Sequence, residues 1–240
     1  MNIIIDQGNS AVKIALFEHN TLVKSFQPEV LTPEVLQTVI RKFQPQAGIL
    51  CAVKKTDPDL CDFLAGILPV FYELNSQLPL PLTIDYRTPE TLGMDRVAAA
   101  VGAFAQKPEK NLLVIDMGTA ITLDFVTAEG IYKGGNISPG PVLRFKALHH
   151  FTNRLPLLDE QGDLPALGYN TETAIRSGVI EGIVRELDSY IEEYKKKHAV
   201  FAFLTGGHSF YFETKLKNSI FADGNLVLKG LNEILKYQEE

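Results

Sequence analysis

The sequence predicts an α/β protein built from two similar halves, each with the element order β-β-β-α-β-α-β. An apolar strand that ends in Asp-x-Gly, turns through small polar residues and leaves as an alternating strand occurs at residues 1–18 and again at 112–126. In each half, a third strand and then alternating helix and strand patterns follow this hairpin. A pattern repeated over this length indicates a duplication, and the polar stretch Lys107–Asn111 separates the two copies. We therefore expect two domains, 1–110 and 111–240.

Length and composition place the chain among globular proteins. Its 240 residues fit two domains of ordinary size, and 45% of them are apolar, which is enough for two cores. Mean hydropathy is +0.03, and no window approaches the roughly 18 continuous apolar residues of a membrane span. The chain begins with a strand pattern, without a basic leader or a small-residue cleavage site. The expected location is therefore the cytoplasm.

The charge balance argues against nucleic acid as a partner. The formal net charge is −6, whereas proteins that bind nucleic acid neutralise its phosphates with clustered lysine and arginine. The basic run Lys195–His198 is predicted to end a helix, where positive charge suits the helix dipole. Cys51 and Cys61 lie in apolar stretches without metal-ligand spacing, so we interpret them as reduced core thiols.

The first half contains clear helix-start signals. Thr32-Pro33 offers an N-cap followed by a first-turn proline, and Asp57-Pro58 repeats this arrangement. The stretch 74–91 contains several prolines and no helical period, which predicts an extended crossing segment. The predicted elements of this half are strands at 1–6, 11–18, 21–27, 47–53 and 70–74 and helices at 32–43, 57–68 and 93–104.

The second half repeats the order with a longer helix. Residues 134–140, GGNISPG, are rich in glycine and proline and predict a tight turn that exposes backbone. Residues 155–167 are predicted to be irregular. The predicted elements are strands at 112–117, 121–126, 130–133, 199–204 and 226–228, helices at 141–150 and 171–196, a short helix after 205–207 and a C-terminal helix.

The two Asp-x-Gly hairpins have the chemistry of a phosphate and cation site. Gly8 and Gly118 would let backbone N–H groups approach phosphate oxygens that a Cβ would keep away. Asp6 and Asp116 offer hard oxygen ligands for cations, and Lys13 adds a compact positive charge. One such hairpin is weak support, because Asp-x-Gly is also a common turn, but two copies in register are much stronger. The sequence has neither a P-loop nor a protein-kinase signature.

Other candidate residues carry weaker signals. Thr205-Gly206-Gly207 follows a buried strand and is either a nucleotide loop or a plain strand-to-helix turn. His208 comes next and is compatible with either interpretation. His149 and His150 lack spaced acidic or cysteine partners, so we interpret them as surface or loop residues.

Five motifs occur in order along the chain and together resemble type III pantothenate kinase. They are D-x-G-N-S-x-x-K at 6–13, L-G-x-D-R at 92–96, D-x-G-T-A-x-T-x-D at 116–124, G-G-x-I-x-P-G at 134–140 and G-x-x-T-x-x-A-I-x-x-G at 168–178. That family belongs to the acetate/sugar kinase–chaperone–actin superfamily, in which two ribonuclease H-like domains hold ATP in a cleft between them. The resemblance covers nearly the whole chain. It implies this fold and the ATP-dependent phosphorylation of pantothenate to 4'-phosphopantothenate, the first step of coenzyme A biosynthesis.

The resemblance also implies roles for individual residues. Asp95 would be the general base, and Asp116 would hold a monovalent cation, K⁺ or NH₄⁺, while Mg²⁺ would accompany ATP. The family is dimeric, with substrate sites at or near the subunit interface, so a homodimer is expected. ATP would be bound by Asp6, Gln7, Gly8, Asn9, Ser10, Ala11, Val12, Lys13, Gly118 and Thr119. Pantothenate would contact Tyr86, Gly93, Met94, Asp95, Arg96 and Thr171.

Some alternatives remain open at this stage. Gln7, Ser10 and Met94 depart from the usual family pattern, although Ser10 keeps the hydroxyl that a phosphate contact needs. Arg96 either clamps the pantothenate carboxylate or braces Asp95. A sugar or N-acetylhexosamine kinase with the same fold and a non-catalytic ATP-binding regulator are the two rival functions. The motif at 92–96 argues against the sugar kinase.

Overall fold

The chain forms two compact units in a computed structural model that describes residues 1–53 and 57–239. The first unit comprises Met1–Lys110, Phe125–Gly134 and Asn225–Glu240, and the second comprises Asn111–Asp124 and Gly135–Gly224. The expected boundary after residue 110 coincides with a change of unit. Residues 125–134 and the C-terminal helix, however, lie in the first unit, because that helix packs against another helix of the first unit.

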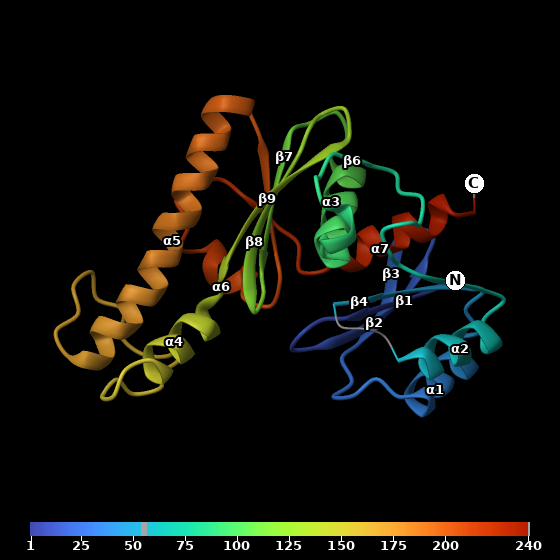
Figure 1. The fold of residues 1–240 in the computed structure, drawn as a ribbon, viewed down its shortest axis with the longest axis horizontal. Helices are drawn as coiled ribbons and strands as arrows, with labels where there is room; N and C mark the ends of the chain where they lie inside the picture. Colours follow the sequence, from blue (N-terminus) through green and yellow to red (C-terminus); the bar gives the residue numbers. More distant parts are fainter. Residues whose placement is uncertain (54–56, 240) are drawn as a thin grey trace. The chain divides into compact units, whose positions relative to one another are not determined.

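The first unit is built on a sheet with the order β3-β2-β1-β4-β5. Figure 1 shows helices α1 and α2 of this unit next to each other. Strand β1 pairs antiparallel with β2 and parallel with β4. Alternate residues of β1 face opposite ways, so Ile3 and Ile5 pack with helices α1 and α2 in one core. The strands are β1 (Asn2–Gln7), β2 (Val12–Glu18), β3 (Thr21–Phe26), β4 (Ala47–Ala52) and β5 (Val70–Glu73), and the helices are α1 (Pro33–Phe43) and α2 (Pro58–Ile67).

Helices α3 (Met94–Gln106) and α7 (Leu226–Tyr237) pack tightly against each other in the first unit. Helix α7 also contacts β1 and β4. A Cβ on Gly102 would overlap the carbonyl oxygen of Leu226, and one on Gly230 would overlap that of Ala98. The crossing therefore depends on two glycines that let the helix backbones touch.

The second sheet has the order β11-β10-β7-β8-β9-β6. Without β6, its order β9-β8-β7-β10-β11 repeats that of the first sheet, which confirms the predicted duplication. The strands are β6 (Thr83–Ile84), β7 (Leu112–Met117), β8 (Ala120–Val126), β9 (Ile131–Pro139), β10 (Phe201–Thr205) and β11 (Phe221–Ala222). The remaining helices are η1 (Pro89–Thr91), α4 (Pro141–His150), α5 (Thr171–His198) and α6 (Ser209–Glu213).

Three predictions about secondary structure were wrong. The glycine-rich residues 134–140 are not a tight turn, because β9 continues to Pro139. Residues 226–228 are not a strand but the first turn of α7. The proline-rich stretch 74–91 contains two short regular elements, β6 and η1.

Two other expectations, on the basic helix end and on the cysteines, were confirmed. Lys195–His198 forms the last turn of α5, as predicted for a basic helix end. Cys51 and Cys61 are free thiols, the first buried and the second half-buried. Across the residues that the structure describes, no helix is long and apolar enough to cross a membrane.

Candidate active site

Asp6 and Lys13 lie opposite each other where the first hairpin leaves the sheet. The antiparallel register of β1 and β2 pairs Asp6 with Lys13, and the parallel register of β1 and β4 pairs Asp6 with Cys51. Paired residues of neighbouring strands point to the same face, and Asp6 alternates with Ile5, which packs toward α1 and α2. The side chains of Asp6 and Cys51 therefore point to the opposite face, the one that α7 contacts.

The electrostatics of Asp6 place a second carboxylate close to it. Burial raises the pKa of Asp6 from 3.8 to about 6, the Lys13 ammonium opposes this rise, and the negative charge of Asp95 adds to it. Burial likewise raises the pKa of the Cys51 thiol, with further contributions from Asp6 and Asp95. The first unit thus brings together Asp6, Lys13 and Asp95, which come from two of the sequence motifs.

Asp95 stands in the first turn of α3. Gly93 is the N-cap, and the backbone N–H of Arg96 donates a hydrogen bond of 2.9 Å to Oδ1 of Asp95. A Cβ on Gly93 would lie 2.6 Å from the same carboxylate oxygen, so the glycine makes room for it. Arg96 is buried, with 7% of its surface exposed, and Met94 is half-buried. The helix start therefore fixes the Asp95 carboxylate, whose charge also suits the positive end of the dipole.

In each Asp-x-Gly turn the glycine N–H donates to a backbone carbonyl across the turn, three residues on in the first half and two residues on in the second. Gly8 N–H donates to the carbonyl of Ala11 at 3.0 Å, and Gly118 N–H donates to the carbonyl of Ala120 at 3.1 Å. The first turn is the more accessible: Asn9, Ser10 and Ala11 are exposed, whereas Gln7, Gly8, Val12, Gly118 and Thr119 are half-buried. The hydroxyls and amides expected to contact phosphates thus lie in turns at corresponding positions of the two halves.

In the second unit, the Thr205-Gly206-Gly207 loop lies against Asp116. Thr205 pairs with Asp116 in the parallel register of β10 and β7. Gly206 has φ +93, and a Cβ there would overlap both the Asp116 carboxylate and the Met117 backbone. The backbone N–H of His208 donates to the Met117 carbonyl at 3.1 Å. The structure therefore places this loop in contact with the second hairpin. The order of the strands along the sequence could not predict this contact.

The last glycine of the G-G-x-I-x-P-G motif belongs to the same cluster. Gly140 N–H donates to the carbonyl of Thr119 at 3.0 Å. A Cβ on Gly140 would overlap the carbonyl oxygens of Gly118 and Thr119. The motif thus supports the turn that carries Thr119, which is a role that sequence reasoning missed when it assigned 134–140 to a loop.

Tyr86 lies beside β9 in the first unit. Its ring meets Tyr132 edge-on, with centroids 6.3 Å apart and planes at 63°. A Cβ on Gly134 would lie 3.0 Å from two carbons of the Tyr86 ring. Tyr86 is therefore half-buried against the strand and keeps part of its surface open to solvent.

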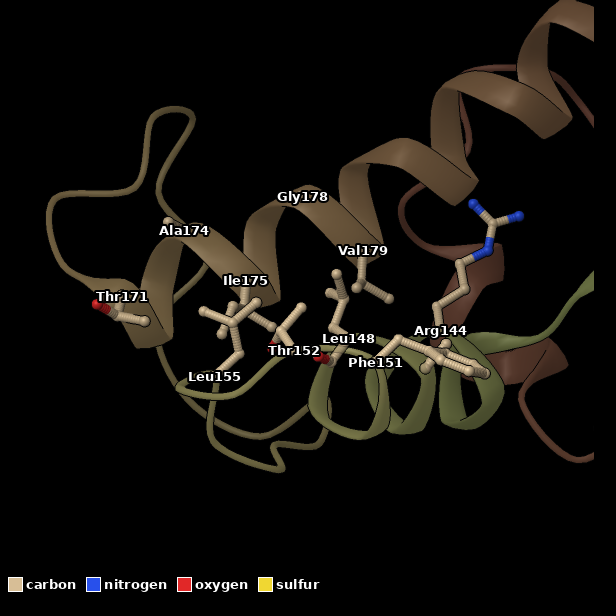
Figure 2. A pocket seen from close by; sticks show the side chains of 11 residues that line it. Arg144, Leu148, Phe151, Thr152, Leu155, Thr171, Ala174, Ile175, Gly178 and Val179 are labelled. Carbon is tan, nitrogen blue, oxygen red and sulfur yellow. Dashed lines mark hydrogen bonds between the residues drawn. The ribbon is translucent and has the colours of Figure 1, made fainter.

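Thr171 lines an apolar groove of about 830 Å³ between α4 and α5. It is the first residue of α5, after the capping box formed by Asn170 and Thr173. Figure 2 shows Thr171 at one end of this groove and Arg144 toward the other. The remaining lining residues are Ala147, Leu148, Phe151, Thr152, Leu155, Ala174, Ile175, Gly178 and Val179. Thr171 is the one predicted site residue among them.

Among the described residues, the histidines and acidic side chains do not form a preassembled metal centre. Within residues 1–53 and 57–239, no group of three or more His, Cys, Asp or Glu side chains could hold a metal ion. His149 is exposed in the last turn of α4, and its Nδ1 lies 2.8 Å from the carbonyl oxygen of Leu155, as suits the predicted surface or loop role. Any cation at Asp116 would therefore need oxygen ligands from the backbone or from a bound substrate as well.

The chain resembles known proteins along its whole length. The family model described as type III pantothenate kinase matches residues 2–193. A type III pantothenate kinase from Azobacteroides pseudotrichonymphae genomovar. CFP2 is 58% identical over 240 residues, which are 100% of this chain and 98% of that protein. One from Bacteroides fragilis (strain ATCC 25285) is 48% identical over 239 residues, covering 99% of this chain and 98% of the relative.

Solved structures show the same fold at low sequence identity. A conserved protein from Campylobacter jejuni, described as a candidate Baf family transcriptional activator, gives a TM-score of 0.65 at 24% identity and covers 99% of this chain and 98% of its own. A glucokinase from an Antarctic psychrotroph gives 0.55 at 10% identity, with 98% of each chain covered. These likenesses confirm the two-part α/β kinase fold. On the sequence relatives and the family model, the chain belongs to the type III pantothenate kinase family.

Proposed function

We propose that this kinase transfers the γ-phosphoryl group of ATP to the primary hydroxyl of pantothenate, giving 4'-phosphopantothenate for coenzyme A biosynthesis. Membership of the family and the names of its relatives support the substrate. The observation that carries the chemistry is the electrostatic coupling of Asp6, Lys13 and Asp95 in the first unit. Phosphoryl transfer needs positioning and charge stabilisation more than covalent chemistry. Lys13 supplies a positive charge, Asp6 a negative one, and Asp95 would act as the base.

The two hairpin turns would bind ATP. Residues 6–13 would hold phosphate oxygens through the amides of the turn, the Ser10 hydroxyl and the Lys13 ammonium. Gly118 and Thr119 would contribute the corresponding groups of the second hairpin. The support is that each turn is closed by a backbone bond from its glycine, and that neither turn is buried.

Asp95 would orient the pantothenate hydroxyl and accept its proton as the O–P bond forms. Its carboxylate is held by the Arg96 amide, which leaves the second oxygen to face the hydroxyl. Tyr86, Gly93, Met94, Arg96 and Thr171 would contact the rest of the substrate. Arg96 is buried beside Asp95, and its backbone N–H braces that carboxylate. Its guanidinium would clamp the pantothenate carboxylate through two hydrogen bonds.

Asp116 would hold a monovalent cation, and Mg²⁺ would accompany ATP. The residues fit such an ion, because Asp116 is a half-buried hard oxygen donor and Gly118 and Gly206 leave the backbone close to it. When bound, these cations neutralise phosphate charge. Asp116→Asn should remove the rate difference between potassium and sodium buffers. A variant that responds to the swap as strongly as the wild type would remove Asp116 from this role.

A homodimer in the cytoplasm is the proposed assembly and location. The exposed apolar groove between α4 and α5 supports an interface, because monomeric proteins rarely leave a broad apolar surface uncovered. The finding that no described helix could span a membrane is compatible with this location.

A coupled assay that follows ADP release tests the proposed function directly. Purified protein with ATP, Mg²⁺ and K⁺ should release ADP when pantothenate is added, and mass spectrometry should find the phosphate ester. ADP release with N-acetylglucosamine instead would make the chain a sugar kinase. Silence with both substrates, in protein that still binds ATP, would make it a regulator.

A further inference from the structure

The segment that carries Tyr86 is fastened to the beginning of β9. Strand β6 pairs in parallel with β9, so that Ile84 lies opposite Tyr132. The N–H of Thr83 donates to the Gly130 carbonyl at 3.0 Å, and the N–H of Asp85 donates to the Tyr132 carbonyl at 2.9 Å. We call residues 83–86 together with residues 130–134 the β6–β9 clasp. It fixes the backbone on which Tyr86 stands.

The clasp continues past the backbone bonds into side-chain contacts. Lys133 and Asp85 form an ion pair at 2.6 Å, which is exposed and therefore adds little stability. The Tyr86 ring packs edge-on against Tyr132, which is fully buried. Tyr132 thus provides a rigid wall on one side of the Tyr86 ring.

Gly134 provides the second wall. Its φ of +94 is a conformation that residues with a Cβ rarely adopt. A Cβ built there would lie 3.0 Å from both Cδ2 and Cε2 of Tyr86, closer than side chains normally approach. Any residue other than glycine would therefore strain the strand and push the Tyr86 ring away from it.

We infer that Gly134 is a positioning residue for the substrate site and acts through Tyr86, whose ring it seats against β9. This inference rests on the proposed contact between Tyr86 and pantothenate. It gives the glycine pair of the G-G-x-I-x-P-G motif two separate tasks. Gly135 lets β9 lie directly over the backbone of Leu123 and Asp124, and Gly134 seats the aromatic ring.

Gly130 is a matched control for the strain of an added Cβ, because its part in the clasp is a backbone carbonyl bond to Thr83 that alanine keeps. It also has a positive φ, +76, and a Cβ there would lie 3.0 Å from a ring carbon of Phe104. Gly130→Ala therefore introduces the same backbone strain and the same kind of ring displacement as Gly134→Ala. Phe104 belongs to the last turns of α3, at the end opposite Asp95, and we assign it no contact with substrate.

Steady-state kinetics of the two variants test the inference. Gly134→Ala should raise the KM for pantothenate about tenfold while kcat and the KM for ATP stay within about twofold. Gly130→Ala should lower the melting temperature about as much as Gly134→Ala does, and it should leave the pantothenate KM within about twofold of wild type. In a Tyr86→Ala background, Gly134→Ala should add no further rise. An unchanged pantothenate KM in Gly134→Ala, or an equal rise in Gly130→Ala, would overturn the inference.

A second measurement is independent of catalysis. In protein labelled with 3-fluorotyrosine, the ¹⁹F resonance of Tyr86 is identified by its loss in Tyr86→Phe. Gly134→Ala should shift that resonance and Gly130→Ala should leave it in place. A shifted resonance in a protein that does not phosphorylate pantothenate would contradict the proposed function, but it would support the role of Gly134 in positioning the Tyr86 ring. If Gly134→Ala leaves the resonance unmoved, Gly134 does not position the Tyr86 ring, whatever the activity of the variant.

Discussion

Asp6 is a charged residue held where its charge is costly. Burial raises its pKa to about 6, above the 3.8 of an unhindered aspartate, so the folded protein binds this proton more tightly than the unfolded chain does. Asp6 alone therefore costs the folded state nothing below about pH 4. Its unfavourable contribution to the free energy of unfolding grows as the pH rises from about 4 to about 6 and is complete above that range. The proposed role of Asp6 in binding cations and phosphates would account for a carboxylate at this costly position.

Replacement of Asp6 by asparagine should stabilise the metal-free protein at neutral pH. The rise of the Asp6 pKa from 3.8 to about 6 corresponds to a gain of about 3 kcal/mol in the free energy of unfolding of the variant at pH 8. Because the wild-type carboxyl is increasingly protonated at low pH, the gain should fall to about half at pH 5 and be small at pH 4. Urea unfolding at these three pH values measures the difference. A stability difference that does not change with pH would show that Asp6 is not the titrating group. The Asp6→Asn variant should also fail to bind ATP at every pH.

Asp95 differs from other first-turn acids in the charges that face it. We expect Asp95→Asn to lower kcat about 10²–10⁴-fold, because asparagine cannot accept the hydroxyl proton, while the Kd for ATP stays unchanged. Asp59 is the matched control, since it also stands in the first turn of a helix, α2, and is exposed. Asp59→Asn should leave kcat near wild type. Near-normal turnover in Asp95→Asn would exclude Asp95 as the base.

At the scale of elements, the crossing of α3 and α7 sets where Asp95 can lie. Ala98, whose carbonyl oxygen touches Gly230, is one helical turn from Asp95. A methyl group on Gly230 cannot be accommodated without moving one helix, since it meets backbone rather than a flexible side chain. The C-terminal helix therefore supports the part of α3 that carries Asp95, although it is far from Asp95 in sequence.

Gly230→Ala should destabilise the first unit by about 1–3 kcal/mol, the usual cost of overpacking. Gly66, inside α2 of the same unit, has nothing within 4 Å of an added Cβ. Gly66→Ala should accordingly stabilise the protein by about 0.4–1 kcal/mol through the lower entropy of the unfolded chain. Urea unfolding followed by circular dichroism compares the two variants. Equal changes in both would mean that the helix crossing does not depend on Gly230.

The elements that sequence reasoning predicted well are those with local signals. The capped helix after Thr32-Pro33 and the alternating strands of both hairpins depend on residues close in the chain, and they appear where expected. The apolar run at Leu226 was misassigned because three apolar residues cannot distinguish a strand from a buried helix turn. Residues 134–140 were misassigned because Gly134 and Gly135 are required by contacts with Tyr86 and Leu123, which are distant in sequence.

The candidate site divides in the same way. The Asp-x-Gly turns could be predicted, because each turn is made by residues within a single short stretch. The coupling of Asp6 to Asp95 and the contact of Gly206 with Asp116 arise from packing between separate elements. The groove beside Thr171 leaves a faint trace in the sequence, the small residues Ala174 and Gly178 one turn apart on α5, but small residues alone predict no cavity.

At the scale of the whole molecule, the groove between α4 and α5 should be covered by a second copy of the chain. Phe151 lines the groove and is 81% exposed, so its burial in an interface would contribute much of the association energy. Light scattering of the wild type should give twice the 26.6 kDa of one chain. Phe151→Asp should shift this mass toward that of a single chain at micromolar concentration, with an unchanged circular dichroism spectrum, because a desolvated carboxylate opposes association.

Val30→Asp provides the control for that experiment. Val30 is 63% exposed in the first unit and does not line the groove, so the same new charge there should leave the dimer intact. If the substrate site depends on the neighbouring subunit, the Phe151→Asp monomer should also have a higher KM for pantothenate, since Thr171 lines the same groove. A wild-type mass of 26.6 kDa would rule out the dimer. A dimer that survives Phe151→Asp would place the interface on another surface.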